Sequence, residues 1–280
     1  MAPSARPMAS PSQNLTPPSY HAGAAPLTAS TALATWCLAT ATFFLIGTSL
    51  GGGLGASVVA QILALALVPI AVMRLHGVTH LNGVTHLLGL GRPPWRAIAG
   101  AALAGAGTWY VSLRLAVPIL DATGRTEQAR DISRAVTGDG AALPWVLLAS
   151  ALVPATCEEI LHRGMLLPAL AARAGRVAAL AAVTVLFAVM HIEPARMAAA
   201  ACIGLAAGIL ALRTRSLWPA ITLHLVNNVC ALVVGTEQVP GVTRPIAGHP
   251  DATLAITLAC TAAGLALGVT HKIPPNTGQP

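Results

Sequence analysis

The sequence predicts an all-α, polytopic membrane protein with about eight transmembrane helices. Hydrophobic residues make up 55% of the 280-residue chain and charged residues only 9%, whereas about a quarter of the residues in a typical soluble domain are charged. A helix needs about 20 apolar residues to cross the hydrocarbon core of a bilayer, and the apolar residues here gather in runs of about that length. No polar stretch between the runs is long enough to form a second domain.

The apolar runs fall into two groups. Four runs span a bilayer outright or nearly so, and they are residues 31–50, 55–73, 97–113 and 252–270. Four others are shorter or contain polar residues, and they are 141–170, 177–192, 197–212 and 217–234. Together the eight runs predict a single transmembrane domain over residues 30–271.

Both ends of the chain differ from the apolar domain in composition. Residues 1–29 are rich in Pro, Ser and Ala and carry a single charge, Arg6. A segment of this kind buries too little apolar surface to fold, so we expect a disordered N-terminal tail. A cleaved signal peptide is not expected, because the residues directly before Thr31 are uncharged. Residues 272–280 form a similar C-terminal tail.

The formal charge of +7 does not indicate nucleic-acid binding, because the basic residues stand at the ends of apolar runs without interleaved aromatics. With eight spans the two termini share one side of the membrane. The basic residues expected on that side are Arg6, Arg74, Arg92, Arg96, Arg173, Arg176, Arg213, Arg215 and Lys272. Those expected on the opposite side are Arg125, Arg130, Arg134, Arg196 and Arg244. Because cytoplasmic loops carry the excess of Lys and Arg, we expect a multi-pass protein of the cell membrane with both termini in the cytoplasm.

Two groups of reactive side chains have simple structural interpretations. All five cysteines fall in apolar runs and are expected to be small core residues. Cys157 has the alternative of acting as a nucleophile, which requires a cationic and partly wet setting. His76, His80 and His86 lie in or beside a duplicated segment, GVTHLN followed by GVTHLL. Solvated loop histidines are a simpler interpretation of these three than a metal site.

The stretch VPATCEEILHRGMLLP, residues 153–168, places charged groups inside an apolar run. Ionisable groups at membrane depth cost at least about 2.5 kcal/mol each, so they normally face a protein interior or a water-filled cavity. Glu159 and Arg163 are spaced i, i+4 with the acid first, which favours an ion pair. Glu158 points about 100° away on a helix and stays free. We therefore expect Glu159 to turn toward Arg163, away from a cavity that Glu158 faces.

Two further polar pairs follow in later runs. Phe187 and His191 share one helix face, and so do His224 and Asn228. A single intramembrane histidine is as often a hydrogen bonder between helices as a catalytic group. Taken together, however, one carboxylate, two imidazoles and one carboxamide from three helices are the groups needed to activate water and stabilise an oxyanion. Glu158, His191 and His224 are expected to face one cavity.

The three motifs resemble those of a known family. They are Glu158-Glu159-x-x-x-Arg163, Phe187-x-x-x-His191 and His224-x-x-x-Asn228. In this order and at these separations they resemble the CPBP family of CAAX proteases and bacteriocin-processing enzymes, also called the Abi family. The resemblance runs at least from residue 154 to residue 232, and it implies an intramembrane endopeptidase acting on a peptide or membrane-protein substrate within the lipid bilayer.

The resemblance also implies a role for each motif residue. Glu158 would be the general base, and the catalytic groups that complete the site would be His191, His224 and Asn228. The supporting residues would be Glu159, Arg163 and Phe187. His191 and His224 with a Glu could hold one Zn²⁺ and leave a position for water, or they could orient water without a metal. Of the two, the metal-independent glutamate mechanism is expected, because the amide of Asn228 suits an oxyanion better than zinc.

Two other functions fit a chain of this kind. A relative of the same family could bind a membrane partner without catalysis, as an immunity or scaffold protein. Buried His and Glu residues also occur in the ion pathways of transporters. Transporters, however, have Gly/Pro-interrupted half-helices in corresponding halves, whereas the polar groups here lie between residues 158 and 228. A peptidase is therefore the favoured interpretation.

Overall fold

A computed structural model describes residues 27–78, 81–129, 142–235 and 240–270. The two expected tails, 1–29 and 272–280, fall outside the described residues except for 27–29. There the chain already enters the first helix, because the Thr28 hydroxyl caps it by accepting from the Thr31 backbone N–H at 3.1 Å.

Every regular element among the described residues is a helix, as predicted. The elements are α1 (Ala29–Ser49), α2 (Gly53–Ala60), η1 (Gln61–Leu67), α3 (Val68–Leu75), α4 (Leu81–Leu87), α5 (Trp95–Ala122), α7 (Leu143–Leu147), η2 (Leu148–Leu152), α8 (Val153–Glu159), η3 (Ile160–Leu166), α9 (Leu167–Ala174), α10 (Arg176–Val189), α11 (Pro194–Thr214), α12 (Trp218–Gly235), α13 (Pro240–Gly248) and α14 (Pro250–Val269). The η segments are π-helical.

Each of the eight predicted apolar runs coincides with a helical segment. Helices α2, η1 and α3 join end to end, as do α7, η2, α8, η3 and α9. Within the described residues, six helices are long and apolar enough to cross a membrane, whereas α10 and α12 are shorter apolar helices. The two short helices carry or directly precede the predicted catalytic histidines.

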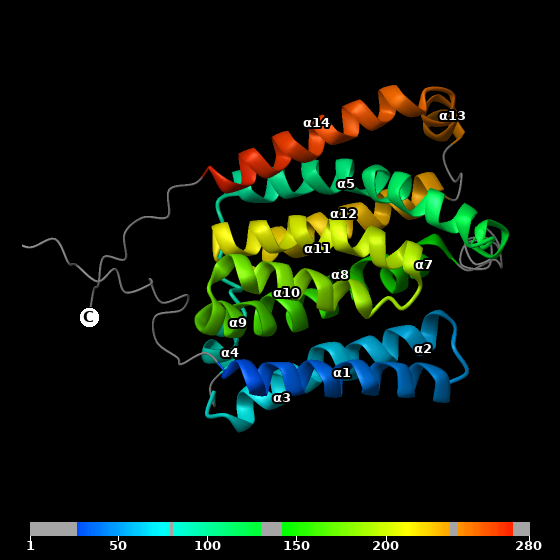
Figure 1. The fold of residues 1–280 in the computed structure, drawn as a ribbon. Helices are drawn as coiled ribbons and strands as arrows, with labels where there is room; N and C mark the ends of the chain where they lie inside the picture. Colours follow the sequence, from blue (N-terminus) through cyan, green and yellow to red (C-terminus); the bar gives the residue numbers. More distant parts are fainter. Residues whose placement is uncertain (1–26, 79–80, 130–141, 236–239, 271–280) are drawn as a thin grey trace, which may run out of the picture.

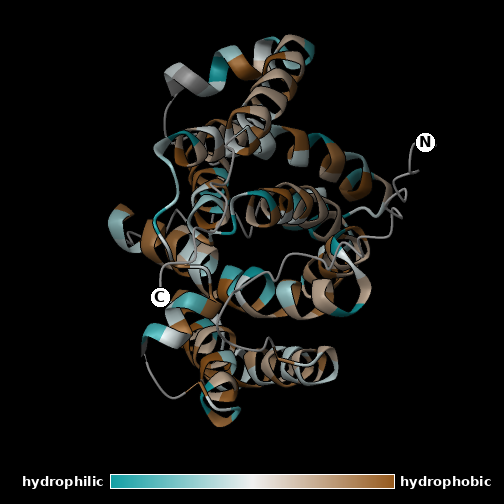
Figure 2. Cartoon of the chain, turned by 90° about the vertical axis from the view of Figure 1, so that its left-hand side faces the viewer, coloured by the Kyte–Doolittle hydropathy of each residue, from teal (hydrophilic) through white to brown (hydrophobic). Residues whose placement is uncertain are grey.

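The helices lie side by side in a bundle (Figure 1). Helices α14 and α5 form one side, α11 and α12 lie next to them, and α1 to α3 form the opposite side. The start of α1 and the end of α14 lie at the same end of the bundle, as an even number of passes requires. Figure 2 shows the helices nearly end-on, with hydrophobic residues along most of them.

Small residues allow the C-terminal half of the bundle to pack tightly around α5. A Cβ atom added to Gly100 would lie 2.5 Å from the Gly264 carbonyl oxygen of α14. On another face of α5, a Cβ at Gly105 would lie 2.4 Å from the carbonyl oxygen of Leu223. Close backbone approach at small residues is typical of helix pairs in membranes. It fixes α12, and with it His224, against α5.

The charged stretch of the sequence lies where an α-helix changes to a π-helix. Helix α8 ends at Glu159 and η3 begins at Ile160. In a π-helix the backbone bonds reach five residues back, and such turns are frequent at functional sites. The buried residues of this region include both glutamates, His162 and Arg163. Periodicity of 3.6 residues did not predict this change of helix type.

Candidate functional site

A cavity of about 1160 Å³ brings the predicted catalytic residues together. One wall comes from the end of α1 and its connection to α2, including Phe43, Phe44 and residues 51–53. The opposite wall comes from α8, the end of α10, α11 and α12. The predicted catalytic residues that line it are Glu158, His191, His224 and Asn228.

The two adjacent glutamates have different surroundings. Glu158 is 8% exposed and lines the cavity, whereas Glu159 is completely buried. Among the described residues, no group hydrogen bonds to Oε2 of Glu158. This Oε2 is itself buried, so the contact of Glu158 with the cavity rests on its place among the lining residues. Of the two adjacent carboxylates, Glu158 lines the cavity and Glu159 does not, as expected.

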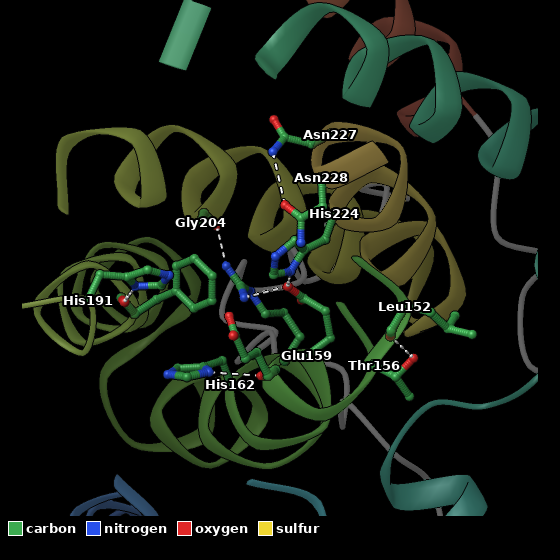
Figure 3. Close-up of polar contacts among 12 residues, drawn as sticks. Leu152, Thr156, Glu159, His162, His191, Gly204, His224, Asn227 and Asn228 are labelled. Carbon is green, nitrogen blue, oxygen red and sulfur yellow. Dashed lines mark hydrogen bonds and ion pairs between the residues drawn. The ribbon is translucent and has the colours of Figure 1, made fainter. Parts of the chain in front are cut away.

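One carboxylate oxygen of Glu159 contacts side chains of two different helical segments. Its Oε1 lies 2.8 Å from Nη1 of Arg163, which confirms the predicted i, i+4 ion pair. The same Oε1 lies 2.9 Å from Nδ1 of His224 on α12. Glu159 turns toward Arg163 and does not line the cavity, as expected, but its bond to His224 was not predicted. Spacing of i, i+4 predicts contacts within one helix only. His224 contacts the carboxylate because α12 packs against α8. Figure 3 shows these contacts meeting at Glu159.

Arg163 is 2% exposed, and its guanidinium makes three contacts inside the protein. Besides its ion pair, Nη2 donates to the Gly204 carbonyl oxygen on α11 at 2.9 Å. The guanidinium also lies over the Phe187 ring, 4.4 Å from its centroid. A Cβ at Gly204 would lie 3.2 Å from the Phe187 ring and 3.4 Å from Arg163. Gly204 was not predicted, although a glycine in an apolar span is a sign of close packing.

Phe187 is the common neighbour of the three buried or partly buried imidazoles. Its ring centroid lies 5.1 Å from His191, as the i, i+4 spacing predicted, 5.8 Å from His224 and 5.0 Å from His162. The His162 and His224 rings meet it nearly at right angles, the edge-to-face geometry that aromatic rings favour. Phe187 is completely buried. It therefore sets the spacing between α10, η3 and α12.

The hydrogen bonds of the imidazoles determine which nitrogen faces the cavity. Nδ1 of His191 lies 2.9 Å from the Phe187 carbonyl oxygen. Because a carbonyl only accepts, this Nδ1 carries the hydrogen. In His224 the corresponding Nδ1 is bound to Glu159. Both rings therefore keep Nε2 for a ligand in the cavity.

Asn228 is oriented by its neighbour. Nδ2 of Asn227 donates to Oδ1 of Asn228 at 3.2 Å (Figure 3). This bond occupies the carbonyl oxygen of the Asn228 amide and leaves its NH₂ group for the cavity that Asn228 lines. Asn227 is 4% exposed and is not among the residues that line the cavity.

The described side chains contain no cluster of the kind that holds a resident metal ion. Within the described ranges, no three His, Cys, Asp or Glu side chains are grouped closely enough to hold one. A catalytic zinc takes three protein ligands. His76 uses Nδ1 to bind the Val72 carbonyl oxygen at 2.9 Å, and His80 lies outside the described residues. No step of the mechanism below passes through a metal.

Cys157, the alternative nucleophile, and His162, the imidazole outside the three motifs, do not line the cavity. Cys157 is 5% exposed and is not among the residues that line the cavity. His162 is completely buried, and both of its nitrogens have partners. Neither side chain can reach a substrate in the cavity.

Comparison with known proteins agrees with this geometry. Residues 140–230 match the family described as type II CAAX prenyl endopeptidase Rce1-like. The matched segment contains the cavity residues of α8, the end of α10, α11 and α12. No curated protein and no solved structure matches the chain significantly. Over residues 140–230, the match confirms the resemblance that the three motifs carry.

Proposed function

We propose that the protein is an intramembrane endopeptidase, with Glu158 as the general base that activates water. The observation that carries this proposal is the placement of Glu158 on the wall of a cavity of about 1160 Å³ together with His191, His224 and Asn228. Glu158 lines this cavity, and no described group occupies its Oε2, which supports its assignment as the base. The neighbouring carboxylate is already held by Arg163 and His224.

The reaction follows from the hydrogen-bonding capacity of each group. Glu158 removes a proton from water as the oxygen attacks the peptide carbonyl. The lone pair on Nε2 of His191 accepts the second water hydrogen and orients the attack. The NH₂ group of Asn228 donates to the oxyanion that forms. Glu158 then returns its proton to the leaving amine.

Glu159 supports this chemistry without touching the substrate. A carboxylate at Nδ1 fixes the orientation of an imidazole, as in other enzymes where a buried acid orients a histidine. The Glu159 oxygen lies 2.9 Å from Nδ1 of His224. Arg163 offsets the charge of the Glu159 carboxylate in the low-dielectric interior.

The same proposal includes an orientation in the membrane. Arg74 ends α3, Arg96 begins α5, Arg173 ends α9 and Arg213 ends α11, and these four helix ends lie at the end of the bundle where α1 starts (Figure 1). An excess of basic residues marks the cytoplasmic side. We therefore place both termini in the cytoplasm and the mouth of the cavity, near residues 51–53, on the opposite face.

A cleavage assay with Glu158→Gln tests the proposed function. The probe is a quenched fluorescent peptide with a farnesylated CAAX terminus, alongside the same peptide without the prenyl group, and the full-length protein is reconstituted in lipid nanodiscs. Glu158→Gln should abolish cleavage, because the amide cannot take a proton from water, while expression and thermal stability stay at the wild-type level. Asp251→Asn, which neutralises a carboxylate that is 92% exposed, is the matched control and should cleave normally. A non-catalytic immunity or scaffold protein would show equal cleavage signals in wild type and Glu158→Gln.

A further inference from the structure

A hydrogen bond joins the first helix to the motif helix. Trp36 on α1 lies 3.1 Å, Nε1 to Nε2, from His162 on η3. The two residues are 126 positions apart in the sequence. Trp36 lies outside the segment that matches the protease family, residues 140–230. Its contact is therefore a feature of this chain that the family comparison does not cover.

The other nitrogen of His162 binds the backbone of Glu158. Nδ1 lies 2.8 Å from the Glu158 carbonyl oxygen. A carbonyl oxygen only accepts and an indole N–H only donates, so His162 must carry its hydrogen on Nδ1 and its lone pair on Nε2. The ring is neutral and both nitrogens are used. His162 thus forms a continuous link from the Trp36 indole to the Glu158 backbone.

The Glu158 carbonyl lies next to the junction of two helix types. Helix α8 ends one residue later and the π-helical segment η3 begins at Ile160, so the register of backbone hydrogen bonds changes here. A donor from a buried side chain fixes the peptide of Glu158 at this junction. Because a displacement of about 1 Å in a catalytic group can cost about 100-fold in rate, such a constraint matters for catalysis.

Helix α1 also forms part of the cavity. Phe43, Phe44 and Gly47 of α1 line the same space as Glu158. Trp36 lies two turns before them on the same helix. The helix that contacts an occupant of the cavity is therefore tied, through Trp36, to the backbone of the general base.

We propose that Trp36 and His162 are positioning residues for Glu158, and that they couple the position of α1 to that of the carboxylate. The link between α1 and Glu158 is argued from the two hydrogen bonds of His162. Its effect on catalysis rests on the proposed function. His162→Asn keeps a donor at the distance of Nδ1 but removes the acceptor for Trp36. His162→Gln keeps a polar atom at the distance of Nε2 but removes the donor to Glu158.

The Glu158 carbonyl can be observed directly. Glu158 and Glu159 form the single Glu-Glu pair in the sequence, so cell-free synthesis with glutamate labelled at the carbonyl carbon and the nitrogen gives one carbonyl–amide NMR cross peak, from this peptide bond. Trp36→Phe should move that peak although Trp36 does not touch Glu158, and His162→Gln should move it further. Trp109→Phe, which removes another buried indole at a distance from the site, should leave it in place. An unmoved peak in Trp36→Phe overturns the coupling.

Turnover of the farnesylated probe tests the catalytic part. His162→Gln should lower kcat about tenfold and Trp36→Phe about fivefold, with KM little changed, as the loss of one buried hydrogen bond at the base predicts. Trp36→Phe combined with His162→Asn should be no slower than either alone, because both remove the same bond. Wild-type kcat in His162→Gln overturns the positioning role. If wild type shows no cleavage that depends on Glu158, the proposed function fails, while the NMR peak still decides the link between α1 and Glu158.

Discussion

Oε1 of Glu159 lies 2.9 Å from Nδ1 of His224, a residue 65 positions later in the sequence. The same oxygen accepts from Arg163 on the next turn of its own helix. Glu159 therefore has two functions at once. It neutralises a buried cation, and it sets the orientation of an imidazole on another helix. Substitutions can separate these two functions.

Glu159→Gln should destabilise the protein by about 3–5 kcal/mol, because it leaves Arg163 buried without a counter-charge. Thermal unfolding in detergent measures this loss. The double variant Glu159→Gln with Arg163→Met should regain most of the stability, since no unpaired charge remains. It should not regain peptidase activity, because His224 still lacks its carboxylate. Full activity in the double variant would show that Glu159 serves only the ion pair.

Phe187→Leu should reduce stability by about 2 kcal/mol, since the guanidinium of Arg163 loses a desolvated aromatic face and three imidazoles lose their common neighbour. Activity should fall as well, because the spacing of His191 and His224 depends on this ring. Phe43→Leu, at the far wall of the cavity, is a matched control. Equal stability of the two variants would contradict the central packing role.

Gly105→Ala should lower stability by about 1–3 kcal/mol through overpacking. The new Cβ would lie 2.4 Å from the Leu223 carbonyl oxygen, a backbone atom that can move only if α12 moves. Since His224 follows directly, kcat should fall together with the melting temperature. Gly55→Ala on α2, where nothing lies within 4 Å, is the control and should behave as wild type. A stable and active Gly105→Ala protein would mean that α5 does not position His224.

Chelation should leave peptidase activity unchanged, because no three side chains in the described part of the chain group as metal ligands. The measurement is turnover before and after exhaustive dialysis against a chelator, with elemental analysis of the same sample. A loss of activity that added Zn²⁺ reverses, with about one equivalent of metal in the active protein, would contradict the glutamate mechanism.

Local features of the site could be predicted from the sequence because they depend on helix geometry alone. The Glu159 and Arg163 ion pair and the contact between Phe187 and His191 both follow from i, i+4 spacing, and both are present. The eight apolar runs likewise follow from hydropathy, and each corresponds to a helix.

Contacts between helices could not be predicted in the same way. The bond from His224 to Glu159 and the bond from Trp36 to His162 each join residues more than 60 positions apart. They depend on how α12 packs against α8 and how α1 packs against η3, and a hydropathy pattern does not contain crossing angles or depths. The change from α to π geometry at Ile160 was also missed, because a single extra residue per turn leaves no clear mark on an almost uniformly apolar sequence.

The short helix α10 has a consequence for the surrounding lipid. Its 14 residues extend about 21 Å, which is about 9 Å less than the hydrocarbon thickness of a typical bilayer. Val185 and Ile192 on or just beyond it are 59% and 65% exposed, so this flank faces acyl chains. A bilayer accommodates such a mismatch by thinning locally, at a cost of fractions of a kcal/mol per Å. For the endopeptidase proposed above, we expect substrate segments with short hydrophobic stretches to be favoured beside α10, and the acyl-chain length of the host membrane to affect which segments are cleaved.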